Sequence, residues 1–518
     1  MILSFSILGS LSFEIMRIVV FVAVILLNWN LIGSILFGKG PPFPNIVTDS
    51  HEHLPSDGLP MGTLIVGRQG SGKTVTLARQ IVGYFRTFWD RAIFVLDWSG
   101  SISDTILSLI LLHPKEQRDW MLRRLVYDEL GNPDWIIPMP EFSSAYGSTY
   151  EEQVQRVSAN FIKLAPELVE GAPFLAGLAI REIAPQICRL LTAIEEGPGK
   201  SWQITEAKKL LVDSSLLNKA LKEYGYKVPE AKWFLEKVFT QINRRERELR
   251  SYAFTALLGT IEPRAARARV GYHRPGWTPE EVIDRGLMVL VDGSRLINQR
   301  NTQHYLFTQV YSLIMAEINK RQPGNPYDKP VALVMDEVYS LLSIPGMAEE
   351  IAMLAPLYRS RKLELYIVLQ ALSQLAPALR EQIWSIGNII CFALSNLDEA
   401  YEIGQQLFSY EPLSVKLPAR DLRQHPVVET DRGQFLSIAN QIQRLQHREC
   451  IIRRYLSEQS LDRHVRHIPR TMELPVGLSD IPVGAVKEML IRQRGVLVKD
   501  ALSEINSRTL GRRKPPQV

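Results

Sequence analysis

The chain has 518 residues and a mass of 58.9 kDa, which predicts about three units or one domain with large insertions. Hydrophobic residues make up 46% of it and charged residues 22%, which excludes a chain disordered over most of its length. The net charge is only +5, so affinity for nucleic acid must come from local patches. Three distant cysteines form no zinc-binding spacing and indicate buried thiols in a reducing compartment: Cys188, Cys391 and Cys450.

An apolar run lies near the N-terminus. Residues 18–37 carry no charge over 20 positions, and a helix of that length spans the roughly 30 Å hydrocarbon layer of a membrane. A cleaved secretory signal is the alternative, but no basic residue opens the chain and no small-residue cleavage site follows. We therefore expect a single-pass anchor in the cell (inner) membrane within residues 1–40, a linker at 41–60 and the rest of the chain in the cytoplasm. The stretch GKGPPFPN at 38–45 predicts that the chain is stiff where it leaves the anchor.

The motif that organises the chain is GRQGSGKT, residues 67–74. It follows an apolar run at 63–66 and precedes a helix-compatible stretch at 75–82, the context that a nucleotide P-loop requires. Its glycines permit positive φ values, so backbone N–H groups can cradle phosphates at a helix N-terminus. A glycine-rich turn without a ligand is the alternative. The expected nucleotide-binding residues are Gly67, Gln69, Gly70, Ser71, Gly72, Lys73 and Thr74.

The expected ligands of this loop are ATP and Mg²⁺. Lys73 would neutralise the β and γ phosphates, and the Thr74 hydroxyl would bind the metal. After the P-loop helix, residues 91–97 form an apolar run that ends in an acid, which is typical of a buried parallel strand. A helix at 101–112 and a strand at 124–127 continue the α/β alternation.

From residue 148 to 263 strand signals vanish and segments with helical periodicity follow, which predicts an all-helical insertion. The most basic part of the chain ends this insertion. Between residues 242 and 274 eight arginines stand against three glutamates, at positions Arg244, Arg245, Arg247, Arg250, Arg264, Arg267, Arg269 and Arg274. We expect the first four to contact a DNA backbone, with a solvated helix face as the equal alternative.

Sheet signals then return, with strands expected at 286–292 and 330–337 and a helix at 302–319 between them. The second strand ends in Asp336 and Glu337, the carboxylates that a P-loop needs. Asp336 would bind Mg²⁺, and Glu337 would orient and polarise the water that attacks the γ phosphate. A further strand at 363–370 ends in Gln370, which we expect to lie in the ligand crevice as a γ-phosphate sensor.

The last third of the chain is expected to hold a strand at 387–394, a helix at 398–408 and an edge hairpin formed by 434–438 and 449–453. Residues 508–518 are rich in basic residues and predict a flexible tail. The fold class is thus α/β, a P-loop NTPase with a RecA-like, mostly parallel sheet. Its ATPase domain comprises 61–147 and 264–455, the helical insertion 148–263, and a C-terminal helical and basic tail 456–518.

This order of motifs resembles the HerA/FtsK superfamily of hexameric DNA-pumping ATPases. The turn at 97–100 is similar to its Asp-x-x-Gly turn, and the corner at 359–362 is similar to its Gly-Arg-Lys corner, with Ser360 in place of glycine. The single anchor, early P-loop and helical insertion most resemble the TraG/TraD/TrwB-type coupling proteins of type IV secretion. Two departures are Gln69, where that family usually has threonine, and one membrane span where it typically has two.

The resemblance implies a membrane-anchored homo-hexamer that hydrolyses ATP to pass DNA into a secretion channel, with a relaxase and channel proteins as partners. It also implies that Arg361 reaches the nucleotide of a neighbouring subunit as a catalytic finger, with Arg359 as the rival and a structural ion pair as the alternative for either. The spacing of 263 positions from Lys73 to Asp336, most of it due to the helical insertion, indicates a macromolecular substrate. Other interpretations are a double-stranded DNA pump for viral packaging or chromosome handling, and a membrane scaffold that binds ATP as a switch.

Overall fold

The computed structural model describes residues 62–168, 173–195, 201–242, 244–344, 346–351, 360–375, 377–384, 387–408, 415–417, 427–428, 430–453 and 481–508. The expected membrane anchor and linker lie outside the described residues. Within these ranges, no helix is both long and apolar enough to cross a membrane.

An eight-stranded sheet forms the centre of the molecule, in the order β11-β8-β1-β7-β6-β2-β5-β3. Seven strands are parallel and β11 alone runs antiparallel, against β8. Every residue of the eight strands is buried except the last residue of β11, as expected of a parallel sheet covered on both faces. The strands are β1 (Thr63–Val66), β2 (Ala92–Asp97), β3 (Leu125–Glu129), β5 (Met288–Asp292), β6 (Val331–Asp336), β7 (Leu363–Leu369), β8 (Asn388–Phe392) and β11 (Cys450–Arg453).

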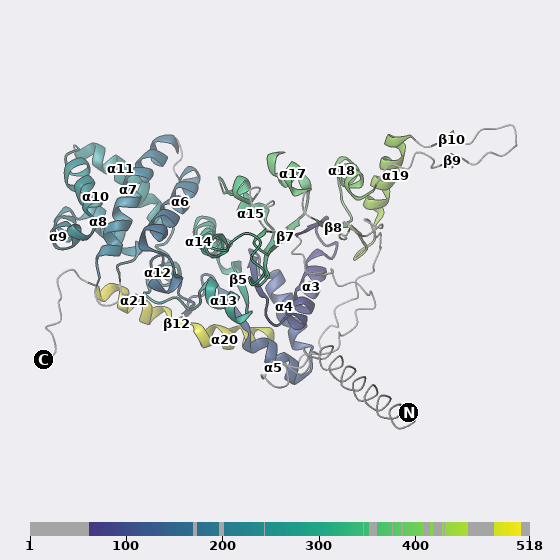
Figure 1. Cartoon of the computed structure of the whole chain (residues 1–518), viewed down its shortest axis with the longest axis horizontal. Helices are drawn as coiled ribbons and strands as arrows, with labels where there is room; N and C mark the ends of the chain where they lie inside the picture. The colour runs from purple at the N-terminus through teal and green to yellow at the C-terminus, as the bar shows by residue number, and fades with distance from the viewer. Residues whose placement is uncertain are drawn as a thin grey trace, which may run out of the picture.

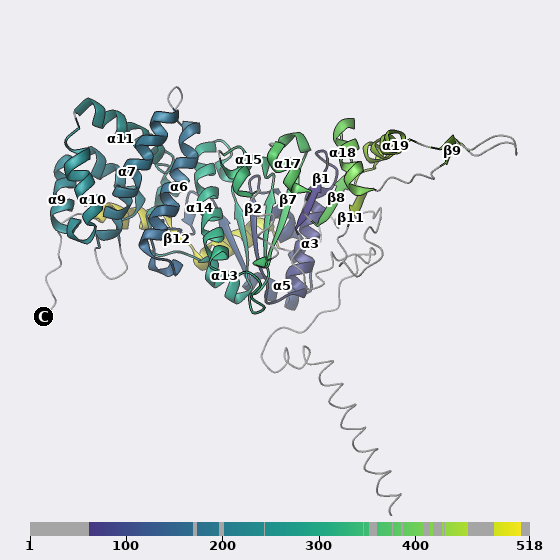
Figure 2. The ribbon, with the colours of Figure 1, turned by 45° about the horizontal axis from the view of Figure 1, so that its top comes forward.

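Helices cover both faces of this sheet, and alternate strand residues point to opposite sides (Figures 1 and 2). Ile65 and Ile93 pack with one set, while Leu64 and Phe94 pack with the other. The first set is α3 (Lys73–Thr87), α4 (Ser101–Leu111), α5 (Lys115–Arg123) and α20 (Val483–Arg494). The second is α13 (Pro279–Arg285), α14 (Arg300–Asn319), α15 (Tyr339–Leu342), α17 (Pro377–Ile383), α18 (Leu397–Leu407) and α19 (Asp431–Arg444).

The predicted insertion is a helical domain at one end of the elongated molecule, with α18 and α19 at the other end (Figure 1). No named strand occurs in its described part. Its core is continuous with that on the second face of the sheet, so the two domains share one apolar cluster. Its helices are α6 (Tyr150–Leu168), α7 (Pro173–Ala193), α8 (Ala207–Val212), α9 (Ser214–Tyr224), α10 (Pro229–Trp233), a π-helical turn (Phe234–Phe239) and α11 (Arg244–Gly259). The short α12 (Arg264–Gly271) follows.

The expected edge hairpin is wrong in its first half. Residues 434–438 lie inside α19, whose buried positions Phe435, Ala439 and Ile442 have helical spacing. The Thr430 side chain begins the helix by accepting a hydrogen bond from the Gly433 N–H. Only the second half is a strand, β11, and its partner is β8. A separate two-stranded ribbon, β9 (Val415–Leu417) with β10 (Val427–Val428), projects beyond α19 (Figure 1).

Residues 481–508 form a strap across both domains, which we call the C-terminal strap. It comprises α20, β12 (Val496–Leu497) and α21 (Val498–Ser507), and β12 pairs with β4 (Trp135–Ile136). In Figure 1 it runs from beneath the sheet to beneath the helical domain. The prediction of a flexible tail from residue 508 is wrong for Arg508, which is buried and ion-paired to Glu206 at 3.4 Å. Residues 509–518 lie outside the described residues.

Candidate nucleotide site

The P-loop joins β1 to α3 as predicted. The N–H of Gly67 donates to Leu369 O of β7 at 3.3 Å, and the N–H of Arg68 donates to Ala393 O just after β8 at 2.7 Å, which fixes the start of the loop. A Cβ on Gly67 would stand 2.5 Å from the Cβ of Phe392, so only glycine fits there. Gly70 and Gly72 have φ values of 74° and 106°, the left-handed region that favours glycine. The loop therefore has the glycine-dependent backbone conformation that a phosphate-binding loop requires.

Lys73 is nearly buried and turns back onto the loop that carries it. Its ammonium donates hydrogen bonds to Gly67 O at 2.6 Å and Arg68 O at 3.0 Å. Burial lowers the pKa of Lys73, while the negative charges of Asp336 and Glu337 act in the opposite direction. The two predicted carboxylates thus lie close enough to Lys73 to act on its charge.

Asp336 ends β6 and Glu337 follows it, with β7 alone between their strand and β1. Burial, and then the charges of Asp97 and Glu337, raise the pKa of Asp336 to about 7. A buried carboxyl of this kind gains most from a cation beside it, and oxygen ligands are what Mg²⁺ prefers. Asp336 therefore fits the role of a magnesium ligand, and Thr74, the other expected ligand, lies in the first turn of α3.

Glu337 has a backbone φ of 50°, a conformation that costs a residue with a side chain on the order of 1 kcal/mol or more. Its N–H donates to Asp336 Oδ1 at 3.0 Å, so the strained turn is held by the neighbouring carboxylate. Burial raises the pKa of Glu337, and the charge of Lys73 opposes that shift. Strain of this kind is retained where a side chain must point in one direction, as expected of a base that orients water.

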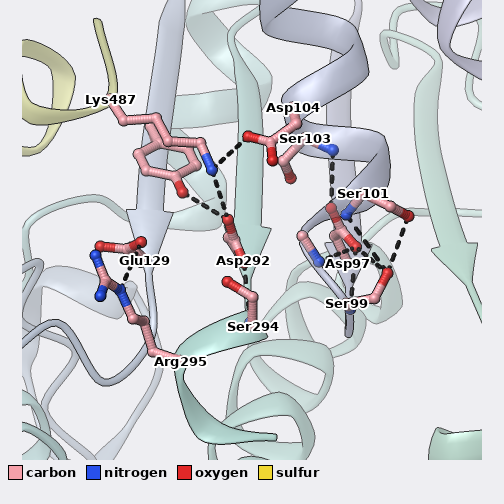
Figure 3. A network of polar contacts seen from close by, with 12 residues as sticks. Asp97, Ser99, Ser101, Ser103, Asp104, Glu129, Asp292, Ser294, Arg295 and Lys487 are labelled. Carbon is pink, nitrogen blue, oxygen red and sulfur yellow. Dashed lines mark hydrogen bonds and ion pairs between the residues drawn. The ribbon is translucent and has the colours of Figure 1, made fainter. Parts of the chain in front are cut away.

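A row of carboxylates follows the carboxyl ends of the strands beyond Asp336. In register across the sheet are Asp336 of β6, Asp97 of β2, Asp292 of β5 and Glu129 of β3. The Asp97 carboxylate accepts hydrogen bonds from the turn that follows it. Its Oδ1 accepts from Gly100 N–H at 2.8 Å, and its Oδ2 accepts from Ser103 N–H at 2.8 Å, at the start of α4 (Figure 3). Burial raises its pKa to about 6 although the Ser103 N–H lowers it. The Asp-x-x-Gly turn therefore caps the start of α4 beside Asp336.

Lys487 enters this row from the C-terminal strap, a contact that sequence reasoning missed. Its ammonium pairs with Asp104 at 2.6 Å and with Asp292 at 3.2 Å, and Tyr127 donates to Asp292 at 2.5 Å (Figure 3). Burial alone would raise the pKa of Asp292, but the hydrogen bonds from Tyr127 and Ser294 and the charge of Lys487 hold it below the usual value. Lys487 thus compensates the charge of Asp292, which lies on the strand next to the edge strand β3.

Gln370 lies directly after β7, between the P-loop strand and the Asp336 strand, as predicted. Its backbone N–H donates to Gln374 Oε1 at 3.1 Å, which fixes the turn. Its side-chain amide forms no hydrogen bond with the part of the chain that the structure describes. Gln370 therefore lies at the carboxyl end of β7, between the strands that end in the P-loop and in Asp336.

Arg361 lies at the opposite edge of the sheet, just before β7 begins. Its Nη1 donates to Asn319 Oδ1 at 2.5 Å and to Ile318 O at 3.4 Å, at the end of α14. The seven residues of β7 separate the two edges by about 20 Å, so Arg361 cannot reach the P-loop of its own subunit. Arg359 lies outside the described residues.

The basic stretch divides into two parts. Arg244, Arg245, Arg247 and Arg250 all lie in the first half of α11 in the helical domain. Arg269 is buried instead, with bonds to the two Asp128 oxygens at 2.6 and 2.9 Å, and so cannot belong to a basic surface. The charge count of the sequence therefore included a structural ion pair.

The parallel sheet, the loop cradle and the carboxylates opposite it define the P-loop class of nucleotide-binding folds, with a helical domain inserted. No model of a protein family and no curated protein matches the sequence. Among solved structures the chain is similar to an unbound form of the bacterial conjugative coupling protein TrwBdeltaN70, at a TM-score of 0.51 and 14% identity, covering 83% of this chain and 88% of that one. The two chains share a fold.

Two further structures have lower scores. TrwB in complex with ADP and Mg²⁺ matches at a TM-score of 0.49 and 15% identity, over 77% of this chain and 83% of that one. VirB4 of Thermoanaerobacter pseudethanolicus matches at 0.41 and 12%, over 80% and 90%.

Proposed function

We propose that the chain is an ATPase that uses Lys73, Thr74 and Asp336 to bind Mg²⁺-ATP and Glu337 to orient the attacking water. The observation that carries this is the convergence of the Asp336 and Glu337 charges on Lys73 across the carboxyl edge of one sheet. Magnesium would supply charge neutralisation on the phosphates. Lys73 would leave the Gly67 and Arg68 carbonyls to bind phosphate oxygens, and Gln370 would contact the γ phosphate from the neighbouring strand end.

We further propose that hydrolysis drives DNA through a homo-hexamer anchored in the inner membrane, in the manner of a type IV secretion coupling protein. The shared fold with TrwB supports this, together with the apolar run at 18–37 and the arginines of α11. The position of Arg361 is compatible with a ring, because at the far edge of the sheet it lies away from the nucleotide site of its own chain and could act only on that of a neighbour. A relaxase and channel proteins would then be the partners.

The test is multiple-turnover ATP hydrolysis by the full chain with and without DNA. We expect single-stranded DNA to stimulate turnover and Mg²⁺ to be required. Stimulation by duplex DNA alone would favour a pump of the HerA/FtsK kind, and nucleotide binding without turnover would favour a membrane scaffold.

Neutralising Arg244, Arg245, Arg247 and Arg250 together should weaken DNA binding and flatten its salt dependence by about one unit of slope for each lost phosphate contact. ATPase activity without DNA should persist. The matched control is Arg264→Ala, an exposed arginine outside α11. An unchanged salt slope in the fourfold variant would place the DNA path elsewhere.

A further inference from the structure

The turn that contains His447 and Arg448 is distant from the P-loop in sequence but forms hydrogen bonds with it. His447 and Arg448 lie between α19 and β11, and because β11 is antiparallel its start lies at the edge where the P-loop stands. His447 Nδ1 lies 2.7 Å from Gly70 O, and the N–H of Arg448 donates to Ser71 O at 2.9 Å. A carbonyl oxygen only accepts, so His447 Nδ1 carries the proton.

These two bonds fix the orientation of two peptide planes in the loop. In a trans peptide the C=O and the following N–H point in opposite directions. Holding Gly70 O and Ser71 O outward therefore turns the N–H groups of Ser71 and Gly72 toward the side where phosphates bind. The Ser71 N–H donates a long hydrogen bond, 3.3 Å, to Arg68 O within the loop.

The turn is strained where it meets the loop. Arg448 has a φ of 67°, a left-handed conformation that is uncommon for a residue with a side chain. Its Cγ lies 3.0 Å from the position that a Cβ on Gly72 would take, so the arginine side chain packs against the residue that immediately precedes α3. The left-handed backbone of Arg448 and the missing side chain of Gly72 thus together permit a close contact between the turn and the P-loop, which lie more than 370 residues apart in sequence.

We propose that His447 and Arg448 form a clamp that preorganises the P-loop for the phosphates of a nucleotide, with His447 as a positioning residue. The clamp holds the loop's donors in place before the ligand arrives, so binding requires less ordering of the backbone. That the ligand is a nucleotide rests on the proposed function. The clamp itself rests on the contacts to Gly70 and Ser71.

The first experiment measures hydrogen exchange of a peptide containing residues 67–74 in the full chain without nucleotide. His447→Ala should speed exchange, and His447→Asn should restore it because the asparagine amide places a donor near the position of Nδ1. The matched control is Gln446→Ala, the exposed preceding residue, whose side chain bonds no described residue. Equal exchange in His447→Ala and wild type would overturn the clamp.

The second experiment measures the dissociation constant of Mg²⁺-ADP with the same variants. His447→Ala should weaken binding about fivefold, the effect of one hydrogen bond, and His447→Asn should recover most of it. An unchanged affinity, or a loss that asparagine does not restore, would contradict the positioning role. If wild type bound no nucleotide while His447→Ala still sped exchange, the clamp would stand and the proposed function would fall.

Discussion

The Lys73 ammonium donates a hydrogen bond to the carbonyl oxygen of Gly67, 2.6 Å away, in the loop on which Lys73 itself stands. The Lys73 side chain is also nearly buried, so its ammonium is held beside the loop. Since its present partners are neutral carbonyls, exchange for charged phosphate oxygens strengthens each bond.

Lys73→Ala should lower ATP turnover by roughly a hundredfold or more, because the β and γ phosphates lose their fixed cation. Steady-state phosphate release measures this. Arg68→Ala is the matched control, since Arg68 is exposed and contributes its backbone N–H to the loop. Equal losses in both variants would mean that the loop, and not the Lys73 charge, had been damaged.

Glu337→Gln should bind ATP and hold it, with turnover reduced by roughly 10² to 10⁴. The amide keeps the size of the side chain and removes the acceptor for the proton of the attacking water. The ATP remaining bound per subunit after separation from free nucleotide measures the trapped state. Turnover at the wild-type rate would show that the carboxylate after β6 has been assigned wrongly.

Arg361→Ala should bind ATP normally and hydrolyse it about a thousandfold more slowly, because a finger that stabilises charge on a neighbour's γ phosphate is lost. Mixing it with Lys73→Ala should restore part of the activity, since some interfaces then combine an intact P-loop with an intact Arg361. Asn319→Ala separates a catalytic finger from a structural residue, because it removes the side chain that Arg361 bonds within its own subunit. If Asn319→Ala were equally inactive, or mixed hexamers stayed inactive, Arg361 would be a structural residue.

Glu364→Gln should flatten the pH dependence of stability. Burial raises the pKa of Glu364 to about 7, although the charge of Arg91 lowers it. Between its unfolded value and pH 7 the folded state binds more protons than the unfolded state, so this residue favours folding as the pH falls and loses that contribution as the pH rises. We expect a difference on the order of 2 kcal/mol between pH 5 and pH 8 in wild type that the variant lacks, measured by urea denaturation. If the free energy of unfolding changed equally with pH in wild type and in Glu364→Gln, this prediction would be wrong.

Arg508→Ala should destabilise the junction between the C-terminal strap and the helical domain by about 3 kcal/mol. Arg508 and Glu206 side chains are only 4% and 0% exposed, and removing one member leaves a buried charge without its partner. Limited proteolysis and urea denaturation measure the loss. Arg267→Ala is the control because its hydrogen bond to Asn506 is exposed, and it should change stability by less than about 0.5 kcal/mol.

Local patterns predicted the strands and the P-loop well. The apolar runs ending in Asp97, Asp292 and Asp336 are all strands, and the insertion is helical as expected. Each signal lies within a few adjacent residues, where periodicity and motif spacing act. The false hairpin at 434–438 came from reading an apolar cluster without its cap, since Thr430 already marked a helix start.

Contacts between distant segments could not be predicted in this way. Nothing in the neighbourhood of His447 or Lys487 indicates that the first binds Gly70 and the second Asp292. Arg269 counted as a surface charge in sequence because its partner, Asp128, lies on another strand. The site is therefore predictable where it consists of strand ends and loops, and not where distant side chains complete it.

The buried pair between Arg508 and Glu206 joins residues 302 positions apart. During synthesis at 5–20 residues per second, Glu206 is made about 15 to 60 s before its partner. Over that interval the helical domain holds a carboxylate without the cation that compensates it in the finished protein. Closure of the junction between the C-terminal strap and the helical domain is thus a late step in the folding of each molecule, because Arg508 is synthesised long after Glu206.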